Sequence, residues 1–198
     1  MQVSDAVLFV LAAVTLINTL VVVQLVRRGR AQVAIKENQQ YGSQAQVAVG
    51  EPAPEFIAGT LAGQELTHER FAGKAMAFAF VSPNCGGCRR AAASIVRAAP
   101  LAQAAAGIQF VMVSDSPASQ TREWIRSLRE DNEVVVTLPV LIAPLSQFDM
   151  IPKYNPEGLF PYFCVVDGDR RLAAHGAVGY EEWDALVREW SSVSAVHS

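Results

Sequence analysis

Two cysteines separated by two glycines, at the point where an apolar segment gives way to a helical pattern, constrain this chain most. They are Cys85 and Cys88. The bounded apolar segment 75–81 lies just ahead of them and has the length of a buried strand. Behind them, apolar residues recur at helical spacing, at Ala92, Ile95, Val96 and Ala99. We therefore expect the two thiols where a buried strand turns into a helix.

The start of a helix favours reactive thiol chemistry. Its first N–H groups have no partner within the helix, and the helix dipole favours negative charge there. A thiol at Cys85 is therefore stabilised as the thiolate, which is the reactive form. Cys88 lies one turn deeper and can attack a mixed disulfide formed by Cys85. The pattern predicts a redox site in which Cys85 attacks and Cys88 resolves.

The same cysteines are compatible with other chemistry. Structural zinc needs a second cysteine pair or closely spaced histidines, but only Cys164 remains and the histidines are scattered, at His68, His175 and His197. Soft thiolates suit Cu(I), so copper binding stays an alternative. Two packed core cysteines are disfavoured because the intervening glycines destabilise a helix unless a close backbone approach requires them. We predict no metal site and no cofactor.

Three motifs carry a resemblance to a known family. They are residues 50–56 (GEPAPEF), residues 80–88 (FVSPNCGGC) and residues 160–168 (FPYFCVVDG). On these motifs the segment 49–190 resembles the thioredoxin-like superfamily. More narrowly, it is similar to the membrane-anchored thiol–disulfide oxidoreductases of bacteria, including the accessory proteins for methylamine dehydrogenase maturation.

The resemblance implies an α/β fold, a thioredoxin-like three-layer sandwich with a mixed central sheet. It also implies that Pro161 is a cis-proline lying against the disulfide. The backbone of Phe160 would then pair with an extended client segment, because proline cannot donate a ladder hydrogen bond. Asn84 and Phe160 are expected to contact the substrate. The partners implied are client protein cysteines and a redox partner protein.

The chain departs from the family pattern at four positions. Asn84 stands where many members have tryptophan, and Phe160 stands where the residue is usually small or β-branched. Ala79 and Ala91 occupy the two positions at which many members carry a buried acid. No evident base is therefore left for Cys88, and the direction of electron transfer stays open.

Two rival functions use the same cysteines. A peroxidatic cysteine of the peroxiredoxin kind follows Pro-x-x-x-Thr/Ser-x-x-Cys; Ser82 fits this pattern, but Phe78 occupies the proline position. We therefore disfavour a thiol peroxidase. A non-catalytic assembly factor that holds Cu(I) or a client protein is the alternative of another class.

The N-terminal segment 6–26 is almost entirely apolar and contains no charged residue. As a helix it would span roughly 30 Å, which matches the hydrocarbon core of a bilayer. A cleaved signal peptide would have a basic start and a shorter apolar core. We predict a retained single-pass anchor at residues 1–27, followed by a glutamine-rich linker at residues 28–48.

The orientation of this anchor is contested. Basic residues follow it, at Arg27, Arg28, Arg30 and Lys36, and none precedes it, so the positive-inside rule places the following domain in the cytoplasm. The family resemblance implies the outer side of the cell membrane. We expect the extracytoplasmic location.

The remaining pattern predicts one domain at residues 49–192 and a short tail at 193–198. Strand–helix alternation predicts a hairpin near residues 56–66, a strand at 108–113, a hairpin at 162–177 and a final helix with Trp183 and Trp190 on its buried face. A further helix is expected to begin at Ser116-Pro117, with Ser116 as its N-cap and Pro117 at its first position. The first helix is expected to end at Ala98 or Ala99, with Pro100 kinking it or opening a second short helix. A net charge of −3 gives no support for nucleic-acid binding.

Overall fold

A computed structural model describes residues 47–196, with side chains to residue 193, and these residues form an α/β domain. Its strands make one sheet in the order β2-β1-β5-β4-β3-β6-β7. The strands are β1 (Ile57–Thr60), β2 (Glu65–Thr67), β3 (Met76–Val81), β4 (Gln109–Ser114), β5 (Val140–Ile142), β6 (Tyr162–Val166) and β7 (Leu172–Ala177). β3 pairs in parallel with β4 and antiparallel with β6, so the sheet is mixed, as expected.

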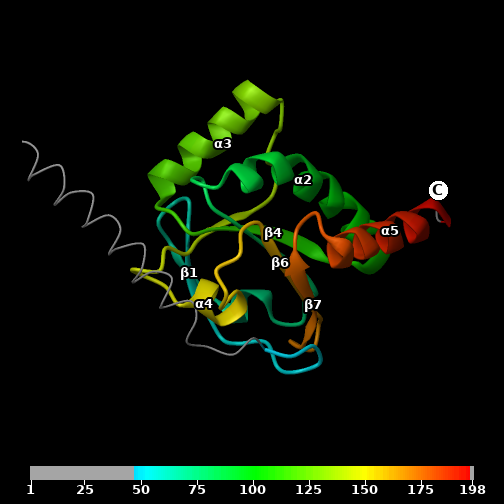
Figure 1. The fold of residues 1–198 in the computed structure, drawn as a ribbon. Coiled ribbons are helices and arrows are strands. Elements are labelled where there is room, and N and C mark those ends of the chain that lie inside the picture. Colours follow the sequence, from blue (N-terminus) through cyan, green and yellow to red (C-terminus); the bar gives the residue numbers. More distant parts are fainter. Residues whose placement is uncertain (1–46, 197–198) are drawn as a thin grey trace, which may run out of the picture. The chain divides into compact units, whose positions relative to one another are not determined.

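Helices cover both faces of this sheet, which gives three layers (Figure 1). The described helices are η1 (His68–Phe71), α2 (Gly86–Ala106), α3 (Ala118–Asn132), α4 (Met150–Tyr154) and α5 (Glu181–Val196). One hydrophobic core joins the sheet to α2, α3 and α5. A second core joins its other face to α4 and to the segment around Phe56 and Phe71. The predicted sandwich is thus present in the described residues.

Strand β3 lies in the interior of the sheet, between β4 and β6, and is buried along its whole length. Its side chains alternate between the two cores, with Ala77, Ala79 and Val81 facing α2, and Met76, Phe78 and Phe80 facing α4. A strand buried on both faces requires a continuous apolar sequence, which is the pattern of residues 75–81. The small alanines on one side let α2 approach the sheet closely.

Helix α2 differs from the sequence-based prediction. The predicted end at Ala98 or Ala99 is wrong, and no second helix begins at Pro100. One continuous helix runs from Gly86 to Ala106, with Pro100 inside it. Pro100 removes one N–H group from the helix. The alanines around it are buried against the sheet, and alanine has the highest helix propensity, so packing outweighs that loss. The helix ends at Gly107, whose φ of 65° is left-handed, as the sequence indicated.

The other predicted elements are present, with small shifts. The β1–β2 and β6–β7 hairpins form, and Trp183 and Trp190 of α5 are buried. α5 continues to Val196, into the predicted tail. The expected serine cap of α3 is wrong, since Pro117 occupies the cap position and the Ser116 hydroxyl donates to Asp115 instead, at 2.8 Å.

The predicted anchor at residues 1–27 lies outside the described residues, as does nearly all of the predicted linker. None of the helices within residues 47–196 is both long and apolar enough to cross a bilayer.

Candidate active site

Cys85 lies where the connection from β3 meets α2. It is the N-cap of that helix, with an extended φ of −99°, and its Sγ atom accepts a hydrogen bond from the Cys88 N–H at 3.2 Å. A sulfur atom thus takes the place that a serine or aspartate oxygen usually holds at a helix start. The half-buried Cys85 thiol also donates to the Phe160 carbonyl at 3.4 Å. The sequence-based expectation of a thiol at the helix start is therefore met.

Cys88 lies in the first turn of α2 and is 0% exposed. Its Sγ atom accepts a hydrogen bond from the Ser82 N–H at 3.3 Å. Burial raises the pKa of the Cys88 thiol far above its usual range, and the nearby Cys85 and Asp115 raise it further, while the Ser82 N–H opposes them. Cys88 is therefore a shielded, protonated thiol beneath Cys85, in the position expected of a resolving thiol.

Pro161 follows a cis peptide bond from Phe160, as the resemblance implied. Gly87 lies between Pro161 and Cys85. A Cβ atom added to Gly87 would lie 3.4 Å from both Cys85 Sγ and Pro161 Cδ. A side chain larger than alanine at residue 87 would therefore separate the cysteine from the proline. This contact explains why residue 87 is small. Gly86 has open space apart from the Arg90 guanidinium, 3.6 Å from where its Cβ would lie.

Asn84 is exposed beside Cys85, on the side of α3. Its side-chain oxygen accepts a hydrogen bond from Gln120 Nε2 at 3.0 Å. Its backbone N–H donates to the Ser82 hydroxyl at 3.4 Å. Asn84 thus ties the cysteine turn to the start of α3. Its role in substrate contact, like the catalytic roles of Cys85, Cys88 and Pro161 and the contact made by Phe160, stays a prediction.

Asp115 is a residue of this site that the sequence reasoning missed. It follows β4, and its N–H donates to the Val81 carbonyl at 3.2 Å, at the end of β3 from which the Cys88 turn departs. The Ser116 hydroxyl holds its carboxylate at 2.8 Å. The signal was available in principle, because parallel strands end at the same edge of a sheet. The two family acid positions hold Ala79 and Ala91, so Asp115 supplies the carboxylate whose charge acts on Cys88.

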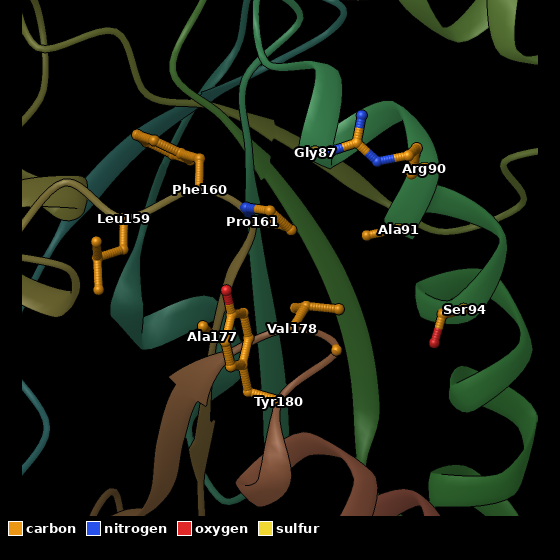
Figure 2. Close-up of a pocket in the computed structure, with 11 residues that line it drawn as sticks. Gly87, Arg90, Ala91, Ser94, Leu159, Phe160, Pro161, Ala177, Val178 and Tyr180 are labelled. Carbon is orange, nitrogen blue, oxygen red and sulfur yellow. The ribbon is translucent and has the colours of Figure 1, made fainter.

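A pocket of about 720 Å³ opens beside the cysteine turn (Figure 2). One wall comes from α2, another from the segment before β6, and the third from the connection between β7 and α5. Its lining residues are Gly87, Arg90, Ala91, Ser94, Leu159, Phe160, Pro161, Ala177, Val178, Gly179 and Tyr180. The pocket is thus mostly apolar, and at one end it is lined by Gly87, whose backbone lies close to the Cys85 sulfur.

The third cysteine belongs to the core on the other face of the sheet. Cys164 is 0% exposed, its thiol donates to the Tyr154 carbonyl at 3.3 Å, and burial raises its pKa above the usual range. It is a packing residue, as predicted. No group of three or more potential metal ligands occurs among the described residues. His197 lies outside them.

Comparison with known proteins places the chain in a family. The sequence model of the AhpC/TSA family matches residues 49–174. The chain belongs to the AhpC/TSA family. A search of curated protein sequences gives no match.

Solved structures identify the fold of this AhpC/TSA family member as thioredoxin-like. The thioredoxin domain of a thiol–disulfide oxidoreductase from Bacteroides vulgatus has a TM-score of 0.57 and 17% identity, with 72% of this chain and 98% of that chain covered. A secreted Mycobacterium tuberculosis disulfide oxidoreductase, homologous to Escherichia coli DsbE, has a TM-score of 0.52 and 18% identity, covering 69% and 95%. A peroxiredoxin-like protein from Aquifex aeolicus has a TM-score of 0.55 and 16% identity, covering 76% and 90%.

The buried thiols predict a pH-dependent stability. Folded Cys88 and Cys164 stay protonated, while the same thiols ionise near the ordinary value of 9.0 once unfolded. The unfolded state then binds fewer protons than the folded state, so the free energy of unfolding falls as pH rises above about 9. The expected loss approaches about 1.4 kcal/mol per pH unit for each thiol.

Urea unfolding of the reduced protein between about pH 8 and about pH 10 measures this slope. A Cys88→Ala variant should lose stability less steeply than the wild type, because one of the two thiols is gone. Identical slopes for the two proteins would contradict the raised pKa of Cys88.

Proposed function

We propose that this chain is a thiol–disulfide oxidoreductase that exchanges a Cys85–Cys88 disulfide with the cysteines of client proteins. One observation supports the proposal above all others: the Cys85 sulfur is reachable at the start of α2, while Cys88 lies buried one turn deeper. A dithiol in which one sulfur meets the client and the other is shielded can pass through a mixed disulfide without exposing both thiols.

The exchange needs only the sulfur atoms of the two partners. In the oxidising direction, a client thiolate attacks Cys85 and the Cys85–Cys88 bond breaks, which leaves Cys88 as a thiolate that takes a proton. A second client thiolate then attacks the client sulfur, so the client disulfide forms and Cys85 departs as a thiolate. Reduction of a client is the same sequence in reverse. The resulting dithiol or disulfide is regenerated by a redox partner protein.

The segment before β6 is proposed to orient the client. Phe160 and Pro161 lie against the cysteines, and Pro161 has no N–H group. An extended client segment can pair with the backbone of Phe160 in the manner of an added strand. The Phe160 side chain, half-buried beside the pocket, would restrict which client side chains fit next to the reactive cysteine.

Insulin reduction in the presence of dithiothreitol tests the proposal. The wild-type chain should accelerate precipitation of insulin chains, whereas Cys85→Ser should match the blank, because no attacking sulfur remains. Cys88→Ser should accumulate a mixed disulfide through Cys85, visible as a mass adduct, since nothing resolves it. Cys164→Ala is the matched control and should keep the wild-type rate. A wild-type rate equal to that of Cys85→Ser would contradict the proposal and favour a Cu(I)- or client-holding assembly factor.

A thiol peroxidase is the second candidate, and the AhpC/TSA family match together with the Aquifex aeolicus neighbour favours it. Against it, the proline of the peroxidatic pattern is replaced by Phe78, which is buried on the sheet face opposite Cys88. Hydrogen peroxide consumption with dithiothreitol distinguishes the two functions. Peroxide turnover that exceeds insulin reduction, and that Cys85→Ser abolishes, would favour the peroxidase.

We further propose that the domain lies outside the cytoplasm, tethered to the cell membrane by the apolar segment 6–26. The length of that segment supports the tether, and the family resemblance supports the location. A reporter fused after His197 that is active only when exported should give a signal. A signal only from a reporter that requires the cytoplasm would contradict it and would agree with the positive-inside rule.

A further inference from the structure

The pocket beside the cysteines carries a cation that the exchange chemistry does not use. Arg90, an exposed residue of α2, is the only charged residue among the described residues that line the pocket. Among the residues whose side chains the structure describes, Arg90 has no ion pair or side-chain hydrogen bond. Its neighbour Arg89, in contrast, pairs with Asp131 at 3.4 Å and donates to Ser127 at 2.9 Å. Arg90 is therefore available to a ligand.

The guanidinium group of Arg90 turns back toward the start of α2. Its Nη1 atom lies 3.6 Å from where a Cβ atom of Gly86 would be, and Figure 2 shows the group directed toward Gly87. A Cβ atom added to the next residue, Gly87, would lie 3.4 Å from the Cys85 sulfur. The positive charge therefore lies over the first turn of α2, the turn that carries the reactive thiol.

The rest of the pocket wall is mostly apolar. Leu159 and Tyr180 are 45% and 68% exposed, and they are two of the five large hydrophobic side chains that the described residues leave exposed. Val178 and Pro161 lie between them and α2 (Figure 2). A client segment lying on this surface would displace water from around Arg90, and an ion pair is stronger where water is excluded.

The helix geometry sets an upper limit on the distance, along the helix, between the cation and Cys85. The backbone of Arg90 lies five residues beyond Cys85, which is about 7.5 Å along a helix, and the guanidinium group turns back from there toward Gly86. An extended client advances about 3.3 Å per residue. Arg90 is therefore within reach of a client side chain about two residues from the reactive cysteine.

We infer that this site selects client segments that carry a carboxylate about two residues from the reactive cysteine, which pairs with Arg90, and discriminates against lysine or arginine there. The inference deepens the proposed function and rests on it. The evidence is the unpaired cation at the edge of a mostly apolar pocket, to whose wall the described part of the chain contributes no acidic residue.

Peptides with a single cysteine, activated as a mixed disulfide with neutral 2-thiopyridine, test this selection. The Cys85 thiolate attacks the peptide sulfur, the bond to 2-thiopyridine breaks, and 2-thiopyridone leaves with the electron pair and a proton from water. The Cys88 thiol then displaces the peptide thiol and closes the disulfide. The release of 2-thiopyridone gives the second-order rate constant. The peptides differ only in Asp, Asn or Lys, placed two residues before or two residues after the cysteine.

The reduced full-length wild type should react about five- to tenfold faster with the Asp peptide than with the Lys peptide in at least one of the two placements. Added salt should reduce this ratio, because an exposed pair is screened. Arg90→Glu should invert the order, and Arg90→Ala should remove it. Arg97→Glu is the matched control, since Arg97 is an exposed arginine of the same helix outside the pocket, and it should keep the wild-type order.

Three results would overturn the inference and leave the proposed function intact. Equal rates for the Asp and Lys peptides with the wild type would show no selection. A preference that Arg90→Glu leaves unchanged would place the selecting charge elsewhere. If replacing Arg90 changed the rate constants for the Asp, Asn and Lys peptides by the same factor, Arg90 would act on the Cys85 thiolate and not on the client. Release no faster than that of Cys85→Ser with every peptide would instead overturn the proposed function itself, and the inference with it.

Discussion

The geometry of the site depends on two hydrogen bonds from backbone N–H groups to sulfur. The Cys88 N–H donates to Cys85 Sγ at 3.2 Å, and the Ser82 N–H donates to Cys88 Sγ at 3.3 Å. The first makes Cys85 the cap of α2, so the same contact that starts the helix also holds the thiol at its accessible end. The second anchors the buried sulfur to the end of β3. The contacts that begin α2 are therefore the same contacts that position the two sulfurs.

The sheet supplies the rigid support for these contacts. The cysteine turn follows β3. Asp115 follows its parallel neighbour β4 at the same edge of the sheet, and its antiparallel neighbour β6 begins just after the cis-proline. Three chain segments that are far apart in the sequence thus meet around Cys85. Alanines on the α2 side of β3 and small residues along α2 allow the close approach on which the shielding of Cys88 depends.

The sequence predicted the features that depend on local pattern. The apolar run before Cys85 identified β3, and the apolar spacing after Cys88 identified α2. Pro161 needed the family resemblance, because a proline alone does not show its isomer. Asp115 was missed because its relevance depends on which strand pairs with β3, and the two alanines at the family acid positions gave no hint of it.

The course of α2 through Pro100 was also not predictable from local rules. Proline disfavours a helix interior, and only the buried alanines around it, which require the folded sheet to be known, reverse that preference. The pocket at Arg90 lay beyond sequence reasoning for the same reason. In the sequence, an arginine after the cysteines cannot be told from an ordinary solvated helix residue. Its pocket becomes evident only once the segments next to β6 and β7 are placed beside α2.

The most direct test is the redox equilibrium of the two cysteines. The full-length chain, equilibrated with glutathione buffers of graded potential and then alkylated, should show by mass spectrometry one two-electron couple that links Cys85 to Cys88. Its midpoint should fall between about −270 mV, the range of a reductant such as thioredoxin, and about −120 mV, the range of a strong oxidant. Failure of these two cysteines to form a disulfide in any buffer, or pairing of either one with Cys164, would contradict the account.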